Sequence, residues 1–310
     1  MLVLVTGGAG FIGSHIVHEL VRKKIRVRVI DNLVTGKKEN ISDVINKIEF
    51  VKADICNEKE LKYSLKNVDY VLHQAALRSV PKSIVNPIAY NNVNVHGTLL
   101  LLKLAKENKV KRVVYASSSS VYGNTPELPK KETQLPAPIS PYAVSKLAGE
   151  YYCRMFTEIY GLETVCLRYF NVFGPKQALE SQYAVVIPKF IISALKDEPL
   201  EIHGDGLQSR DFSYIENVVS ANLLAMNSKN AAGKVFNIAC NKRYTILDVA
   251  NIIGKILNKK LKYIHTAPRI GDVRHTLADI SQAKKYLGYK VIVGFEEGMK
   301  RTIEYMRNTI

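Results

Sequence analysis

The sequence of 310 residues contains no tryptophan, only four cysteines, and no apolar run near the roughly 18 to 20 residues that a membrane-spanning helix needs. The cysteines show no C-x-x-C spacing and no neighbouring histidine cluster, so we expect neither a metal site nor a disulfide framework. The opening MLVLVTGG is too short for the apolar segment of a signal peptide. These absences predict a cytoplasmic protein without a membrane span.

The charge balance is strongly basic, with 44 Lys and Arg against 28 Asp and Glu and a formal net charge of +16. The basic residues are spread along the whole chain and form neither a concentrated arm nor a run interleaved with aromatics. We therefore expect no nucleic-acid partner. A basic exterior also favours small anionic ligands.

The first part of the chain alternates short apolar runs with segments of helical period. The runs that predict strands are 2–6, 26–31, 48–55, 68–75, 111–118 and 164–174. Strand alternating with helix predicts a doubly wound parallel sheet, and the nearly continuous apolar character of the strands predicts helices on both faces. The fold class is therefore α/β.

After Pro175 the pattern loosens into short strands, helices and proline-marked loops. Thr245 is a candidate N-cap for a helix with regular apolar spacing, and a last helix is expected over 295–307. We predict a cofactor domain at 1–175 and a smaller α/β substrate-binding lobe at 176–310, with segments crossing between the two.

A glycine-rich loop joins the first predicted strand to the first helix. VTGGAGFIGSH places Gly7, Gly10 and Gly13 where a dinucleotide pyrophosphate rests on a helix N-terminus, as in Rossmann-type domains. Asp31 ends the second strand, where a carboxylate can bind the ribose 2′-hydroxyl and would repel a 2′-phosphate. This predicts NAD rather than NADP. Asp54, at the end of the third strand, is expected near the adenine.

Three further loops follow the fourth, fifth and sixth strands: HQAALRS, ASSSSVYG and RYFNVFG. The carboxyl ends of parallel strands meet at one edge of the sheet, so these loops should converge on the cofactor. The following helix begins with SPYAVSK, in which Tyr142 and Lys146 lie four residues apart and emerge on one helical face. A neighbouring ammonium and the positive nicotinamide ring would lower the pKa of the phenol and make Tyr142 a general base.

Six motifs occur in the order and spacing of the extended short-chain dehydrogenase/reductases. They are TGGAGFIG, SSSSVYG, SPYAVSK, LRYFNVFGP, GDG-x-x-x-RDF and PRIGD. The chain resembles the nucleotide-sugar epimerases of that family over nearly its whole length. Among these enzymes the chain is most similar to UDP-N-acetylglucosamine 4-epimerases, with UDP-glucose 4-epimerases next. The segments that carry this similarity are HQAALRSVPKS, YAVVIPKF and GDVRHTLADIS.

The resemblance implies a set of site residues. The implied catalytic residues are Ser118, which would hydrogen-bond the sugar 4-oxygen, the base Tyr142, and Lys146, which would hold the nicotinamide ribose. The implied NAD contacts are Gly7, Gly10, Phe11, Ile12, Gly13, Asp31, Asn32, Gly36, Asp54, Ile55, Gln74, Ala75, Ala76, Arg78, Tyr142, Lys146 and Tyr169. The implied substrate contacts are Ser79, Ser118, Ser119, Tyr142, Asn171, Val186, Lys189, Glu201, His203, Arg210, Arg269, Asp272 and Thr276. Arg210 and Arg269 would clamp the UDP diphosphate.

The implied reaction is oxidation at C4 of a UDP-hexose, rotation of the 4-keto sugar, and return of the hydride to the opposite face, with NAD bound tightly and regenerated. Thr276 occupies a position that is bulky in epimerases restricted to plain hexoses, so its small side chain predicts UDP-GlcNAc and UDP-GalNAc as substrates, with UDP-Glc and UDP-Gal also accepted. The family's usual assembly, a homodimer formed through two helices per subunit, is expected here too.

Three alternatives compete with this interpretation, and the chain lacks the acid and base that the first of them requires. A sugar-nucleotide 4,6-dehydratase would carry an Asp-Glu pair where this chain has Ser119 and Ser120. A UDP-glucuronate 4-epimerase would need a cation for the carboxylate, which Arg78 or Lys82 could supply. A non-catalytic NAD-binding protein would commonly lack the tyrosine or the lysine, and this chain has both.

Overall fold

The computed structural model describes residues 1–177, 186–267 and 273–309. Within them, seven strands form one sheet in the order β11-β6-β5-β4-β1-β2-β3, and all neighbouring pairs are parallel. The strands are β1 (Leu2–Thr6), β2 (Arg26–Asp31), β3 (Glu49–Lys52), β4 (Tyr70–His73), β5 (Arg112–Ser118), β6 (Glu163–Tyr169) and β11 (Lys234–Ile238). The strand order reverses between β1 and β4, which in such sheets marks the ligand crevice.

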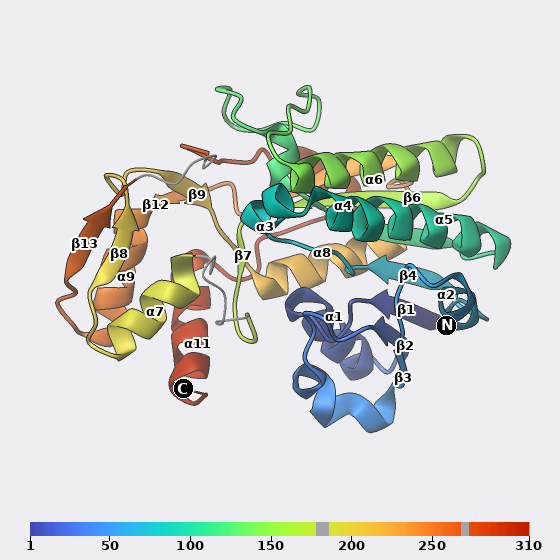
Figure 1. Ribbon diagram of the computed structural model, residues 1–310, viewed down its shortest axis with the longest axis horizontal. Coiled ribbons are helices and arrows are strands. Elements are labelled where there is room, and N and C mark those ends of the chain that lie inside the picture. Colours follow the sequence, from blue (N-terminus) through green and yellow to red (C-terminus); the bar gives the residue numbers. More distant parts are fainter. Residues whose placement is uncertain (178–185, 268–272, 310) are drawn as a thin grey trace.

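Helices cover both faces of this sheet (Figure 1). Alternate residues of β1 contribute to two separate cores, Val3 and Val5 to one and Leu2 and Leu4 to the other, which explains the continuous apolar run. Helices α1 and α8 pack over the first core, and α5 and α6 over the second. The helices are α1 (Phe11–Arg22), α2 (Glu58–Ser64), α3 (Val80–Val85), α4 (Pro87–Tyr90), α5 (Gly97–Glu107), α6 (Pro141–Glu158), α7 (Val186–Leu195), α8 (Ile215–Asn227), α9 (Ile246–Leu257), α10 (Ser281–Leu287) and α11 (Phe295–Arg307).

A smaller group of elements lies to one side of the sheet and contains α7, α9, α11 and short strand pairs (Figure 1). The short pairs are β7 (Val172–Phe173) with β10 (Ser213–Tyr214), β8 (Leu200–His203) with β13 (Tyr263–Thr266), and β9 (Ser209–Asp211) with β12 (Arg243–Thr245). Three short helical turns complete the described elements: η1 (Lys38–Lys47), η2 (Asn91–His96) and η3 (Ser119–Tyr122). Strand β11 and helix α8 come from the C-terminal half of the chain, yet they belong to the large sheet and its covering layer.

Most predicted elements are confirmed, although β3 and β4 are shorter than the predicted strands 48–55 and 68–75 and one predicted strand is divided. The expected strand 164–174 is divided into β6 and β7, because Asn171 adopts a left-handed conformation with φ of 36° and β7 pairs with β10 instead of continuing the large sheet. The Thr245 cap is confirmed as a capping box with Asp248. Helix α11 spans Phe295–Arg307, which confirms the last helix expected over 295–307.

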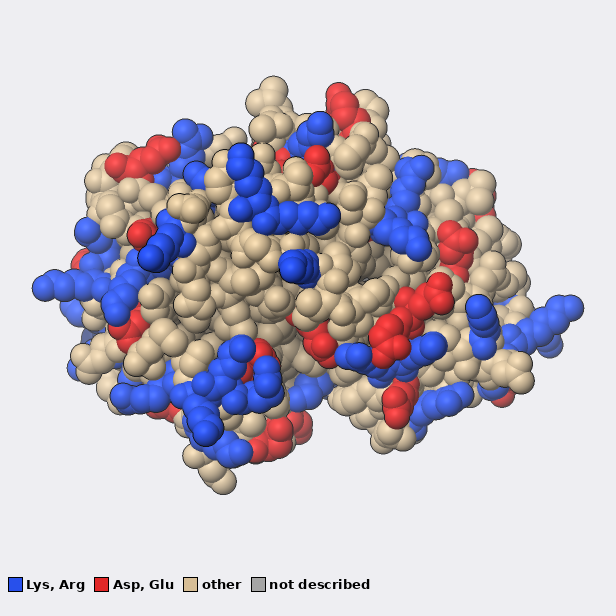
Figure 2. All heavy atoms as spheres, turned by 180° about the vertical axis from the view of Figure 1, so that it is seen from behind, with Lys and Arg blue, Asp and Glu red and all other residues tan. Residues whose placement is uncertain are grey.

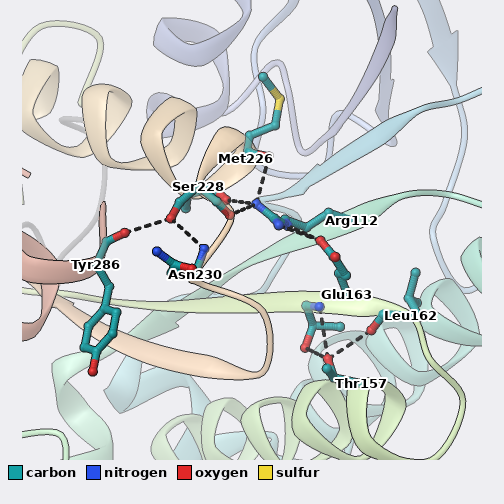
Figure 3. A network of polar contacts seen from close by, with 10 residues as sticks. Arg112, Thr157, Leu162, Glu163, Met226, Ser228, Asn230 and Tyr286 are labelled. Atoms are coloured by element: carbon teal, nitrogen blue, oxygen red, sulfur yellow. Dashed lines mark hydrogen bonds and ion pairs between the residues drawn. The ribbon is translucent and has the colours of Figure 1, made fainter. Parts of the chain in front are cut away.

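Arg112 fixes the end of the sheet that lies away from the predicted site. It is the first residue of β5, whereas Ser118 is the last. Its Nη1 donates to the carbonyl oxygens of Ala225, Met226 and Ser228 at the end of α8, and it forms an ion pair with Glu163 at the start of β6 (Figure 3). A cation placed on the free carbonyls of a helix C-terminus is stabilising. The contact therefore anchors α8 to the sheet without using the edge where ligands bind.

The molecular surface and the cysteines agree with the composition. Lys and Arg are scattered over the face shown in Figure 2, with Asp and Glu between them. The four cysteines are free thiols. Across residues 1–177, 186–267 and 273–309, no helix has the length and apolarity to cross a membrane, and no group of three His, Cys, Asp or Glu side chains is arranged to hold a metal ion.

Candidate active site

A cavity of about 710 Å³ opens at the carboxyl ends of β1, β2, β4 and β5. Its wall contains every residue predicted to contact NAD except Gly36. The predicted NAD contacts that line the cavity are Gly7, Gly10, Phe11, Ile12, Gly13, Asp31, Asn32, Asp54, Ile55, Gln74, Ala75, Ala76, Arg78, Tyr142, Lys146 and Tyr169. The structure thus brings together residues from six segments, five of them at separate strand ends and one on α6.

The glycine loop has the geometry that a dinucleotide requires. Gly7 has φ of 66°, and a Cβ there would lie 2.7 Å from the backbone nitrogen of Ala75. A Cβ on Gly13 would lie 2.1 Å from the carbonyl oxygen of Gly7, so α1 can approach the loop only without a side chain. Gly10 precedes α1 and has no side chain to cap it. The first amides of the helix therefore remain available to an anion such as a pyrophosphate.

Asp31 lies where the cofactor ribose is expected. Its carboxylate accepts the backbone N–H groups of Ala9 (3.0 Å) and Leu33 (2.8 Å), and burial raises its pKa despite these bonds. Gly36 packs against this carboxylate rather than forming the cavity wall, since a Cβ at that position would lie 2.8 Å from the Asp31 oxygens. Asn32 donates to Asp54 at 2.8 Å, which orients both side chains at the next part of the wall.

Tyr142 and Ser118 meet at the end of β5 and the start of α6. Ser140 caps α6 by accepting the N–H of Ala143, so Tyr142 lies in the first turn of the helix. The Ser118 hydroxyl hydrogen-bonds Tyr142 and also lies 3.1 Å from the Ser120 hydroxyl. Lys146 is buried one turn further on, and its Nζ donates to the carbonyl oxygen of Ala116 at 2.8 Å. Ser118, Tyr142 and Lys146 therefore lie close together, with Tyr142 and Lys146 on the cavity wall.

The electrostatics of this cluster differ from the expectation for Tyr142. Burial raises the pKa of Tyr142, while the hydrogen bond from Ser118 and the charge of Arg78 act to lower it. Lys146 does not lower the pKa of Tyr142, because its ammonium faces the Ala116 carbonyl and lies 5.1 Å from the centre of the Tyr115 ring. Burial also lowers the pKa of Lys146 to about 8. Among the described residues, Arg78 is the cation that favours the phenolate.

The loop that carries Arg78 is held by residues that the sequence reasoning did not identify. The side chain of Asn94 accepts the N–H of Leu77 at 2.8 Å and donates to its carbonyl at 2.9 Å, and it also donates to Ser145 on α6 at 3.0 Å. The Tyr90 hydroxyl accepts the N–H of Ser79 at 3.0 Å. Asn94 lies in η2, a π-helical turn, and a wide turn of this kind often marks a functional site. The sequence carried no periodicity signal for it.

The predicted substrate residues divide into two groups. Asn171 and Thr276 lie together, with the Asn171 Nδ2 donating to the Thr276 Oγ1 at 3.2 Å and to the Asp211 carbonyl at 3.0 Å. Arg210 is buried beside them and donates to the carbonyl oxygens of Ser209 and Arg274. Arg269 and Asp272 lie outside the described residues.

The second group lies on α7 and β8. Lys189 forms an ion pair with Glu201, and the His203 Nδ1 is 2.8 Å from the Thr266 Oγ1. Val186 is the first residue of α7. Ser79 caps α3 through its side chain, and Ser119 begins η3.

The cavity wall also includes Gly174, the last residue of the predicted loop RYFNVFG, and residues beyond the predicted loops. The latter are Lys176 and Gln177 after β7, Pro188 on α7, and Tyr305, Met306 and Thr309 at the end of the chain. Lys176 donates to the carbonyl oxygen of Asn40 at 2.7 Å and so joins this segment to η1. No strand-end rule points to the C-terminal helix, and its packing against α7, α9 and β10 brings it here.

The comparisons with known proteins agree with this geometry. Residues 3–239 match the model of the NAD dependent epimerase/dehydratase family. A UDP-N-acetylglucosamine 4-epimerase from Methanobrevibacter ruminantium, solved with UDP-N-acetylmuramic acid, is 42% identical and superposes with a TM-score of 0.95 over 99% of this chain and 98% of its own. A UDP-glucose 4-epimerase from Thermotoga maritima, solved with UDP-glucose, is 38% identical with a TM-score of 0.95 over 100% and 99%.

A UDP-glucose 4-epimerase from Thermus thermophilus, solved with NAD, is 34% identical with a TM-score of 0.92 over the full length of both chains. The glycine loop without a capping side chain, the carboxylate at the end of β2, and the Ser–Tyr–Lys cluster all fit a bound NAD. The cofactor is therefore NAD, and the chain belongs to the NAD-dependent epimerase/dehydratase family of extended short-chain dehydrogenase/reductases.

Proposed function

We propose that this enzyme interconverts UDP-GlcNAc and UDP-GalNAc by epimerisation at C4, and that it also acts on UDP-Glc and UDP-Gal. The observation that carries this proposal is the hydrogen-bonded pair of Ser118 and Tyr142, of which Tyr142 lies on the wall of the NAD cavity. A phenol and a hydroxyl in contact are suited to move the proton of a sugar hydroxyl.

Each residue has one role in this proposal. Bound NAD supplies a reversible hydride acceptor. Tyr142 takes the proton from the 4-hydroxyl and returns it, while Ser118 hydrogen-bonds the same oxygen. Lys146, held by the Ala116 carbonyl, is placed to bind the nicotinamide ribose. Arg78 and the positive nicotinamide ring together oppose the effect of burial on the pKa of Tyr142.

Epimerisation requires the hexose to turn over while the rest of the substrate stays bound. Arg210 suits the diphosphate because a guanidinium binds phosphate oxygens in a bidentate way. Arg210 lies on β9 and Asn171 lies between β6 and β7, so the anchor and the proton-transfer pair lie on different elements. Such a division lets the diphosphate remain fixed while the sugar rotates. We assign the cofactor to 1–175 and most of the substrate-anchoring surface to 176–310.

Thr276 supports the choice of an N-acetylated substrate. Its hydroxyl accepts the N–H of Asp211 and the Asn171 amide, both at 3.2 Å, so the side chain is held against the protein. A small side chain fixed in this way leaves room for an acetamido group. It places no obstacle before a plain hexose, which is why we expect both classes of substrate to react.

We also propose that the enzyme is a homodimer. Helices α3, α4 and α6 present exposed apolar side chains: Ile84, Val85, Ile88, Val144, Tyr151, Met155 and Ile159. Large exposed apolar patches are unusual on monomers and mark interaction surfaces. A second copy related by a two-fold axis would cover them with the same residues.

The test is a paired assay of the purified enzyme with UDP-GlcNAc or UDP-Glc, without added cofactor, and with products separated by anion-exchange chromatography. Formation of UDP-GalNAc supports the proposal and shows that NAD remains bound through purification. Turnover of UDP-Glc alone would contradict the role of Thr276 but would still support epimerisation at C4. If neither reacts with NAD added, UDP-glucuronate is the next substrate to assay, with Arg78 as a candidate partner of its carboxylate.

A further inference from the structure

We propose that Asp211 is a positioning residue of the sugar-nucleotide site, whose buried carboxylate holds the strand that carries Arg210, the segment that carries Thr276, and the loop after β11 in one arrangement. This inference rests on the proposed function, in which Arg210 and Thr276 face the substrate. It adds a residue that does not touch the substrate but determines where those two residues lie.

The carboxylate of Asp211 is fully buried and joins segments distant in sequence. One oxygen accepts the N–H of Cys240 at 2.9 Å, in the loop that follows β11. The other accepts the N–H of Ala278 at 3.2 Å, two residues after Thr276. The N–H groups of Asn241 and Lys242 also interact with it. Several N–H donors converging on one ionised acceptor give a stronger and more directional link than a neutral side chain would.

The backbone of the same residue contacts the predicted substrate residues directly. The Asp211 N–H donates to the Thr276 Oγ1 at 3.2 Å, and its carbonyl oxygen accepts the Asn171 Nδ2 at 3.0 Å. Arg210 is the preceding residue of β9. A shift of Asp211 would therefore displace the diphosphate arginine, the residue beside the hexose and the end of β6 together.

The surroundings of the carboxylate give it no cation. In the described part of the chain it forms no ion pair, and its hydrogen-bond partners are backbone N–H groups. The Cys240 thiol and the Tyr289 phenol face it, and both have raised pKa values, so they are neutral near pH 7. Arg243, its register partner on β12, is exposed, and His275 hydrogen-bonds Ser209.

Burial without a cation raises the pKa of Asp211 to about 7. Above that pH the ionised carboxylate accepts N–H groups at both oxygens. Below it, the proton turns one acceptor into a donor that faces an N–H group, and the link weakens. Substrate affinity should therefore fall as the pH decreases from about 8 to about 6. Protonation of a histidine near the anionic diphosphate would act in the opposite direction, because it would strengthen binding.

The experiment measures UDP-glucose binding by calorimetry to the NAD-loaded Tyr142→Phe enzyme, in which turnover is blocked. UDP-glucose is the probe because its diphosphate is esterified at both ends and does not titrate in this range. Asp211→Asn in that background should weaken binding about tenfold near pH 8, where one N–H loses its acceptor, and should abolish the dependence on pH. Its NAD content should be unchanged, since Asp211 does not lie on the NAD cavity.

Asp197→Asn is the matched control, because Asp197 is an exposed aspartate at the end of α7 and the chemical change is the same. It should bind UDP-glucose normally. Unchanged binding and an unchanged pH dependence in Asp211→Asn would overturn the inference. If Asp211→Asn does not fold, UDP-glucose binding to the Tyr142→Phe enzyme tests the inference by itself. A UDP-glucose affinity that stays constant or rises as the pH decreases from about 8 to about 6 would overturn the inference, and an affinity that falls would support it.

A further variant, Arg210→Ala, separates this inference from the proposed function. Strong loss of UDP-glucose binding in Arg210→Ala with normal binding in Asp211→Asn would reject only the role of Asp211. Normal binding in both variants would reject the proposed diphosphate site and the inference together.

Discussion

Glu150 forms a buried, bidentate ion pair with Arg168 beneath the catalytic cluster. Its two carboxylate oxygens lie 2.9 Å from the Arg168 Nε and 2.7 Å from the Arg168 Nη2. Both side chains are only 4% exposed. The Ser117 hydroxyl also donates to Glu150. Since Ser117 lies on the cavity wall next to Ser118, and Glu150 lies about two helical turns after Tyr142, this ion pair fixes α6 to the strand ends that carry the reacting groups.

Glu150→Ala should lower the free energy of unfolding by about 3–5 kcal/mol, because it leaves the Arg168 guanidinium buried without its counter-charge. Urea unfolding followed by circular dichroism measures this. Glu158→Ala is the control on the same helix: its pair with Arg154 is exposed, and the loss should stay within about 0.5 kcal/mol. Equal losses in both variants would contradict the role given to the buried pair.

Arg78→Gln should move the pH profile of kcat to higher pH. The charge of Arg78 lowers the pKa of Tyr142, so its removal raises that pKa, and more alkaline solution is needed to form the phenolate. Arg78 is exposed, so solvent screens part of its effect, and we expect a shift of about half a pH unit.

The pH profiles of Arg78→Gln and of Lys82→Gln, measured with saturating substrate, test this prediction. Lys82 is an exposed cation on the neighbouring α3 and does not line the cavity, so its substitution should leave the profile in place. A profile unchanged by Arg78→Gln would show that Arg78 does not act on the base.

Thr276→Tyr should reduce kcat/KM for UDP-GlcNAc by about a hundredfold or more, because the larger ring would occupy the space that the acetamido group needs. Activity on UDP-Glc should remain within about tenfold. Thr276→Ser keeps the small size and the hydroxyl that accepts from Asp211 and Asn171, and should preserve both activities. The comparison uses initial rates on the two substrates. Equal losses on both would mean that position 276 acts on the chemistry and not on substrate size.

Gly13→Ala should yield enzyme that lacks bound NAD. The added Cβ would lie 2.1 Å from the Gly7 carbonyl oxygen, so the loop must shift away from the position that receives the pyrophosphate. Gly294→Ala is the control, since nothing lies within 4 Å of a Cβ there and its φ of −73° suits any residue. The measurement is the NAD released from each purified variant by acid. Full NAD content in Gly13→Ala would show that the loop can adapt.

The sequence alone determined the features that are encoded locally. Alternating strands and helices predicted the parallel sheet, because the period of apolar residues directly reflects which faces a segment buries. The glycine loop, Asp31 and the Tyr142–Lys146 spacing could be read for the same reason: each is a short motif whose geometry is set by its own backbone. Resemblance to a family then supplied roles for residues such as Arg210 that no local pattern could assign.

Tertiary structure decided which of these groups act on one another. It placed β11 beside β6, directed the Lys146 ammonium to the Ala116 carbonyl, and brought the charge of Arg78 close enough to lower the pKa of Tyr142. It also joined Asp211 to Asn171 and Thr276 across 40 and 65 residues of sequence. Such contacts depend on the packing of distant segments, and no periodicity within one segment records them. The sequence therefore predicted the chemistry. The fold determined which groups shift the pKa of Tyr142 and which residues hold the substrate site in place.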